Sequence, residues 1–86
     1  MSRDEKLIKK LIKIPANFTY DEMITLLKNF GYTKDVSKRS SGSAVMFFNR
    51  EINDKIMFHK PHPQKEMKKY ILKMIVEKLR NNGMIK

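Results

Sequence analysis

The chain has 86 residues, 41% of them hydrophobic, which is enough for one folded domain over residues 1–86 and too apolar for a disordered segment. It has no cysteine, which excludes a disulfide framework or thiolate zinc site and favours the cytoplasm, and no apolar run approaches the roughly 20 residues of a membrane span. The net charge of +10 makes nucleic acid the expected partner, with an anionic membrane or an acidic protein as alternatives.

Two helices are predicted in the first third of the chain. Leu and Ile recur at helical spacing among lysines, which predicts a helix over about residues 3–13 within an N-terminal extension of about residues 1–15. Thr19 is followed three residues later by Glu22, in the form of a capping box, so a second helix is expected to begin there. Gly31 is well placed to end that helix in a left-handed conformation.

The pattern changes to short strands from Tyr32 onward. A polar stretch leads to a turn at residues 40–43, and the β-prone run 44–48 follows it, as in a hairpin. Turn-forming residues then precede a third strand over residues 55–59. These segments predict a three-stranded antiparallel sheet.

The last helix has the strongest helical pattern and is predicted over about residues 64–81. Its apolar side is expected to comprise Met67, Tyr70, Ile71, Met74, Ile75 and Leu79, with lysines on the other side. The element order is then α-α-β-β-β-α. Together these elements predict an α+β fold in which helices cover one face of the sheet and leave the other face open.

Four short motifs, in order and at matching separations, carry a resemblance to a known family. They are Leu26-Leu27-Lys28-Asn29-Phe30-Gly31-Tyr32, Lys38-Arg39-Ser40-Ser41-Gly42-Ser43, Val45 with Phe47, and His62-Pro63-Gln64-Lys65-Glu66-Met67. With these motifs the chain resembles the HicA toxins of type II toxin–antitoxin systems over nearly all of residues 19–83. The resemblance implies a fold similar to a double-stranded RNA-binding domain, cleavage of messenger RNA without a metal or other cofactor, and neutralisation by a HicB antitoxin.

One position departs from the family pattern. Many members have Gly-Ser-His at the hairpin turn, and the resemblance implies a catalytic role for that histidine, whereas here Gly42 and Ser43 are followed by Ala44. An alanine methyl group neither accepts nor donates a proton, so we expect a nuclease that is inactive or weakened. Ala44 is either the natural residue or a substitution that disables a toxic protein.

Metal-free RNA cleavage needs a base for the 2′-hydroxyl, an acid for the departing 5′-oxygen and cations near the phosphate. Only His59 and His62 remain as imidazole groups for this work. His62 matches a family motif and is interpreted either as an RNA-contacting or acid–base residue or as a side chain that caps its turn. His59 is expected to point away from the core, either into the site or simply into solvent. No metal site is predicted, because the two histidines lack a nearby third ligand.

The residues expected to contact RNA flank the hairpin turn and the segment before the last helix. They are Lys38, Arg39, Ser43, His59, Lys60 and Lys65, whose cations would bind phosphates in a salt-sensitive way. Strand alternation puts Ala44, Met46 and Phe48 on one face, either open to RNA or antitoxin or packed under the first helix or a dimer partner. The lysines of the last helix are expected to form its solvated side.

Three functions are compatible with these residues. The leading one is a toxin ribonuclease that Ala44 disables or weakens. The second is a non-catalytic RNA-binding module that uses the same basic face. The third is a protein-interaction domain whose positive surface holds an acidic antitoxin.

Overall fold

The computed structural model describes residues 3–35 and 44–85, in which helices and strands follow one another in the predicted order. The elements are α1 (Arg3–Ile12), α2 (Tyr20–Asn29), β1 (Thr33–Lys34), β2 (Ala44–Asn49), β3 (Asp54–His59) and α3 (Lys69–Asn81). β2 pairs antiparallel with both β1 and β3, so the predicted α+β class and three-stranded sheet are confirmed. No described helix has the length and apolar character needed to cross a membrane.

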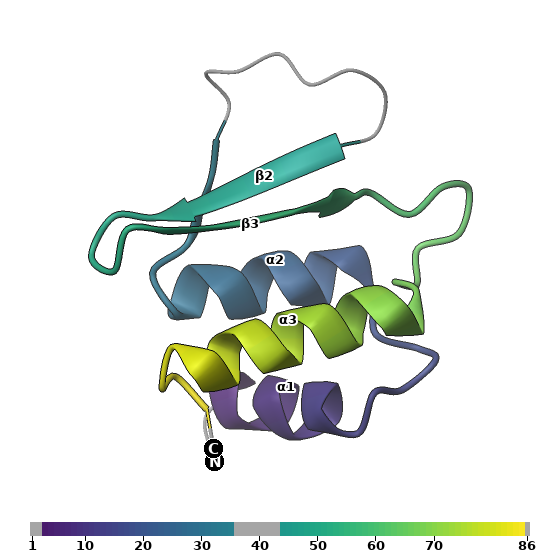
Figure 1. Ribbon diagram of the computed structural model, residues 1–86. Coiled ribbons are helices and arrows are strands. Elements are labelled where there is room, and N and C mark those ends of the chain that lie inside the picture. Colours follow the sequence, from purple (N-terminus) through teal and green to yellow (C-terminus); the bar gives the residue numbers. More distant parts are fainter. Residues whose placement is uncertain (1–2, 36–43, 86) are drawn as a thin grey trace.

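The three helices lie on one side of the sheet (Figure 1). α2 and α3 are nearer to the sheet, and α1 lies beyond them and packs against both. None of the described elements covers the opposite face of the sheet. The predicted arrangement, with helices on one face and the other face open, is therefore confirmed for the described residues.

α2 begins and ends where the sequence indicates. Oγ1 of Thr19 accepts a hydrogen bond from the backbone N–H of Glu22 (3.2 Å), and the Glu22 carboxylate accepts one from the Thr19 N–H (2.9 Å), which completes the capping box. Gly31 has a φ of +90°, the left-handed conformation predicted for the helix end. Lys10 of α1 donates to the same Glu22 carboxylate at 2.9 Å, so this residue also ties α1 to α2.

An aromatic cluster joins the sheet to α2. Val45 and Phe47 of β2 are buried with Ile56 and Phe58 of β3, which confirms the predicted core pair in β2. Phe47 and Phe58 stack with ring centroids 5.7 Å apart. Tyr20 of α2 meets the Phe58 ring edge-on at 6.2 Å. Such aromatic pairs add stabilisation beyond the area they bury, so the cluster fixes the position of β3 relative to α2.

α3 begins at Lys69, later than predicted. The preceding residues run beside the start of α2 instead: the backbone N–H of Tyr20 donates to the carbonyl of Lys65 (3.0 Å), and the N–H of Met67 donates to the carbonyl of Phe18 (2.7 Å). These hydrogen bonds form an isolated antiparallel bridge between Glu66 and Thr19, which the apolar spacing of the sequence does not reveal.

The buried side of α3 is rotated from the predicted one. The buried residues are Ile71, Leu72, Ile75, Val76 and Leu79. Tyr70 and Met74 were predicted to face the core but are 64% and 40% exposed. α3 lies between α1 and the sheet (Figure 1), so its buried side must serve both neighbours, and the rotation turns Tyr70 and Met74 outward.

Candidate nucleic-acid interface

Ala44 and His59 are directly opposite each other in the antiparallel pair of β2 and β3. Opposite residues of such a pair direct their side chains to the same face of the sheet. Their neighbours Val45 and Phe58 are buried toward the helices, so Ala44 and His59 belong to the open face. His59 is exposed, which confirms the prediction that it points away from the core.

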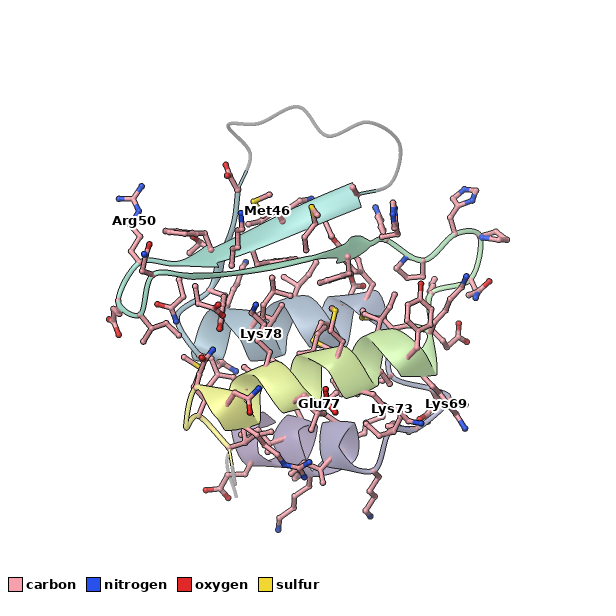
Figure 2. All side chains as sticks on the ribbon, viewed as in Figure 1. Met46, Arg50, Lys69, Lys73, Glu77 and Lys78 are labelled. Carbon is pink, nitrogen blue, oxygen red and sulfur yellow. The ribbon has the colours of Figure 1, made fainter. Side chains whose placement is uncertain are left out.

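The open face continues from this pair along both strands. Met46 lies opposite Met57, and Phe48 lies opposite Lys55. Met57 is 60% exposed, and Figure 2 shows Met46 on the side of β2 away from the helices. The alternative that Met46 and Phe48 pack under the first helix is wrong, because α1 is on the other side of the sheet (Figure 1). A mixed apolar and cationic surface therefore extends from Ala44 and His59.

Lys60 follows His59 and lies against a buried aromatic ring. Its Nζ is 5.4 Å from the centroid of Tyr20, which is 8% exposed. Burial raises the pKa of the Tyr20 hydroxyl, and the charge of Lys60 offsets this only in part. The cation–π contact restricts where the ammonium group lies, so Lys60 places a positive charge against α2 on the helix side of the sheet, one residue after His59.

His62 lies in the segment between β3 and α3 and is exposed. It lines a pocket of about 190 Å³ together with His59 and Lys60 from one side and Lys68 and Tyr70 from the other. The structure thus brings three of the sequence-predicted site residues, His59, Lys60 and His62, around one cavity. Ala44 is across the strand pair from His59, at the edge of this group.

Other predicted site residues are not part of that group. The side chain of Lys65 is exposed, and its backbone carbonyl is bonded to the N–H of Tyr20. Lys38, Arg39 and Ser43 lie outside the described residues. Within residues 3–35 and 44–85, no three His, Cys, Asp or Glu side chains form a group that could hold a metal ion.

The start of α3 adds positive potential next to the pocket. Lys68 is the N-cap residue and makes no side-chain capping bond, and the first turn of α3 contains no acidic residue. The positive end of the helix dipole therefore acts together with the lysines there. Figure 2 shows Lys69 at this end of the molecule, and Arg50 at the opposite end of the sheet.

Sequence reasoning missed Tyr70 and Lys68 as members of this site. The pattern put Tyr70 on the apolar side of the helix and Lys68 on its solvated side, whereas both line the pocket. The available signal was an aromatic residue inside a lysine-rich stretch, Lys68-Lys69-Tyr70. Aromatic rings among cations are typical of surfaces that bind single-stranded nucleic acid.

Comparison with known proteins identifies the family. Residues 20–84 match the family described as "HicA toxin of bacterial toxin-antitoxin". The match begins at the first residue of α2, so α1 precedes it. Neither the search of curated proteins nor the search of solved structures found a match. The likeness to a double-stranded RNA-binding domain therefore stays a prediction. Because the matched region includes α2, the whole sheet and α3, the chain belongs to the HicA toxin family of bacterial toxin–antitoxin systems.

Proposed function

We propose that this protein is an RNA-directed toxin of a type II system, whose family reaction is metal-independent cleavage of messenger RNA in the cytoplasm. The observation that carries the proposal is the pairing of Ala44 with His59 on the open face, with Lys60 next in the chain. Membership of the HicA family supports the toxin role. The charge of +10 supports a polyanionic substrate.

The pairing suggests how the family reaction would run at this site. A histidine at position 44 would lie opposite His59 in the strand pair. The Cβ atoms of such cross-strand pairs are about 4.5–5.5 Å apart, so the two imidazoles would be close together. One imidazole would remove the 2′-hydroxyl proton as that oxygen attacks the phosphorus, and the other would protonate the departing 5′-oxygen. Lys60, one residue after His59, would attract the RNA backbone to this end of the sheet. No metal or other cofactor takes part in this scheme.

Ala44 removes one of the two proton-transfer groups from this scheme. The chain would then bind RNA through Lys60, Lys65 and the predicted contacts Lys38, Arg39 and Ser43, while cleaving it weakly or not at all. His62 would contact the RNA from the segment after β3. The second candidate function, a non-catalytic RNA-binding module, is favoured by this one observation, that Ala44 cannot transfer a proton.

We propose a HicB antitoxin as the protein partner, covering the open face of the sheet. The support is that Met46, Phe48 and Met57 share this face with His59, and that Met57 is 60% exposed. A surface that combines methionines with cations suits an acidic partner with an apolar centre. Binding there would cover the RNA-cleaving pair and so neutralise the toxin.

Placing a histidine at position 44 tests the proposed reaction. The Ala44→His variant, expressed from an inducible promoter, is expected to arrest growth and to cleave messenger RNA, while the chain with Ala44 does so weakly or not at all. Circular dichroism serves as the folding control. A variant that folds normally but neither arrests growth nor cleaves RNA would exclude position 44 as the catalytic point. The codon for residue 44 in the native gene shows whether alanine is natural.

A further inference from the structure

Tyr70 differs from the other two tyrosines of the chain in its surroundings. Tyr20 and Tyr32 are 8% and 0% exposed, whereas Tyr70 is 64% exposed although it lines the pocket before α3. A large ring that is exposed on one side and borders a cavity on the other is available to stack against a second flat ring. An aromatic side chain this exposed contributes little to the core, so the packing of α3 does not explain the tyrosine at position 70.

The rest of the lining has the chemistry of a nucleotide site. Met67 and Ile71, which are 2% and 5% exposed, supply apolar surface, and Pro61 adds more from the opposite side. Lys60 and Lys68 belong to the same lining and supply positive charge. Its ligand should therefore combine a flat, mostly apolar ring with an anionic group.

The geometry points to a subsite for one unpaired base of an RNA strand, stacked on Tyr70 with its phosphate near Lys60 and Lys68. This inference rests on the proposed RNA-directed function and specifies the substrate as single-stranded at this point. The pocket volume of about 190 Å³ is below the roughly 300–1,000 Å³ of sites that enclose a whole small-molecule ligand, so it suits a single base. A base inside a duplex is stacked on both sides and could not enter it.

The position of His59 links this subsite to the proposed chemistry. His59 lines the pocket and also lies opposite Ala44. A base held against Tyr70 would therefore lie close to His59, one member of the Ala44–His59 pair. The pocket would select where an RNA strand is presented for cleavage, by requiring an unpaired nucleotide there.

The test compares three variants of the full chain with two forms of one RNA sequence. Tyr70→Ala is expected to bind a short single-stranded RNA about fivefold to 100-fold more weakly than wild type, the usual effect of losing one stacked base. Tyr70→Phe keeps the ring and should bind within about twofold of wild type. Met74→Ala is the matched control, because Met74 is also exposed on α3 and does not line the pocket. Wild type should prefer the single strand to the same sequence in a duplex.

Tyrosine fluorescence gives a direct second measurement, because the chain has no tryptophan. Single-stranded RNA should quench the emission of wild type, and Tyr70→Ala should lose most of this quenching. Salt-sensitive RNA binding that is equal in wild type and Tyr70→Ala would overturn the base subsite and leave the proposed function standing. Equal affinity for single strand and duplex would also overturn it. Absence of RNA binding by every variant, Ala44→His included, would overturn the proposed function itself.

Discussion

Ala44 and His59 are Cα partners at the end of the β2–β3 ladder, and both belong to the face of the sheet that no described helix covers. The pairing matters for the proposed reaction, which needs a histidine at position 44. A histidine at this one position would therefore place two imidazoles opposite each other on neighbouring strands. In the proposed reaction, position 44 decides whether the Ala44–His59 pair offers one proton-transfer group or two.

The salt dependence of RNA binding should identify Lys60 as a phosphate contact. For single strands, the slope of log affinity against log salt changes by about 0.7 for each phosphate contact that is lost. Lys60→Ala should reduce the slope by this amount. Arg50→Ala removes the same charge at the opposite end of the sheet (Figure 2) and should leave the slope unchanged. Fluorescence anisotropy over a salt series measures the slope for each variant. Equal slopes for Lys60→Ala and Arg50→Ala would exclude a phosphate contact at Lys60.

Two tyrosine-to-phenylalanine substitutions should change stability in opposite directions. Among the described residues, the buried hydroxyl of Tyr20 has no hydrogen-bond partner, so Tyr20→Phe should raise the free energy of unfolding by about 1 kcal/mol. The Tyr32 hydroxyl donates to Asp54 at 2.6 Å and accepts from Asn82 at 3.2 Å. Burial, then Asp54, holds the pKa of Tyr32 well above its usual range.

Tyr32→Phe leaves the Asp54 carboxylate without this donor and should lower the free energy of unfolding by about 1–3 kcal/mol. Urea denaturation followed by circular dichroism gives both values from the midpoints. Shifts of the same sign in the two variants would contradict the hydrogen bonding described for Tyr20 and Tyr32.

The pH dependence of stability should report the Glu22 carboxylate. Burial opposes ionisation, but hydrogen bonds from Thr19 and the charge of Lys10 outweigh it and hold the pKa of Glu22 below its ordinary value of 4.5. A depressed carboxylate pKa stabilises the fold above the ordinary value, and this contribution is lost as the pH falls through the pKa of the folded state. Stability should therefore decline below about pH 4.5.

Glu22→Gln keeps an oxygen for the capping box and removes the charge, so its stability should decline less steeply over the same acid range. Lys10→Met removes one cause of the low pKa and should flatten the curve in part. Urea denaturation at several pH values between 2.5 and 6 measures the curves. If wild type and Glu22→Gln have parallel curves, Glu22 is not the group that titrates.

Asn49 should contribute more to the free energy of unfolding than an exposed asparagine does. Its side chain is 1% exposed, donates to the carbonyl of Phe30 at 2.9 Å and accepts from the N–H of Glu51 at 3.0 Å. Asn49→Ala leaves these buried groups unpaired and should lower the free energy of unfolding by about 1–3 kcal/mol. Asn81→Ala, at an exposed position of α3, should change it by less than about 0.5 kcal/mol. Equal effects in a thermal melt would contradict this role.

Local signals predicted the parts of the fold that depend on local physics. The capping box at Thr19 and Glu22 and the left-handed Gly31 are set by residues near in sequence, and both are confirmed. The start of α3 depends on hydrogen bonds between its preceding residues and the start of α2, which are far apart in sequence. Asn49 shows the same limit: it directly follows the β-prone run 44–48, and nothing in that local sequence indicates that its side chain bonds to Phe30 at the end of α2.

The candidate site, too, could be predicted only where it depends on local sequence. Strand alternation correctly put His59 on the face away from the core. The pairing of His59 with Ala44 depends on strand register, and the contact of Lys60 with Tyr20 depends on how α2 packs on the sheet. Tyr70 was assigned to the core because an aromatic residue at helical spacing fits that pattern, and only the packing of α3 turns it toward the pocket.

The central claim is that a histidine at position 44 would act together with His59 in RNA cleavage. It is tested most directly by the rate at which Ala44→His, with and without His59, cleaves a single-stranded RNA. His62→Ala in the same Ala44→His background is the matched control, because it removes a histidine that lies outside the strand pair. We predict that adding His59→Ala to Ala44→His lowers the rate by about 10²–10⁴-fold, the usual contribution of a positioned acid or base, and more than His62→Ala does. An unchanged rate without His59 would contradict the account.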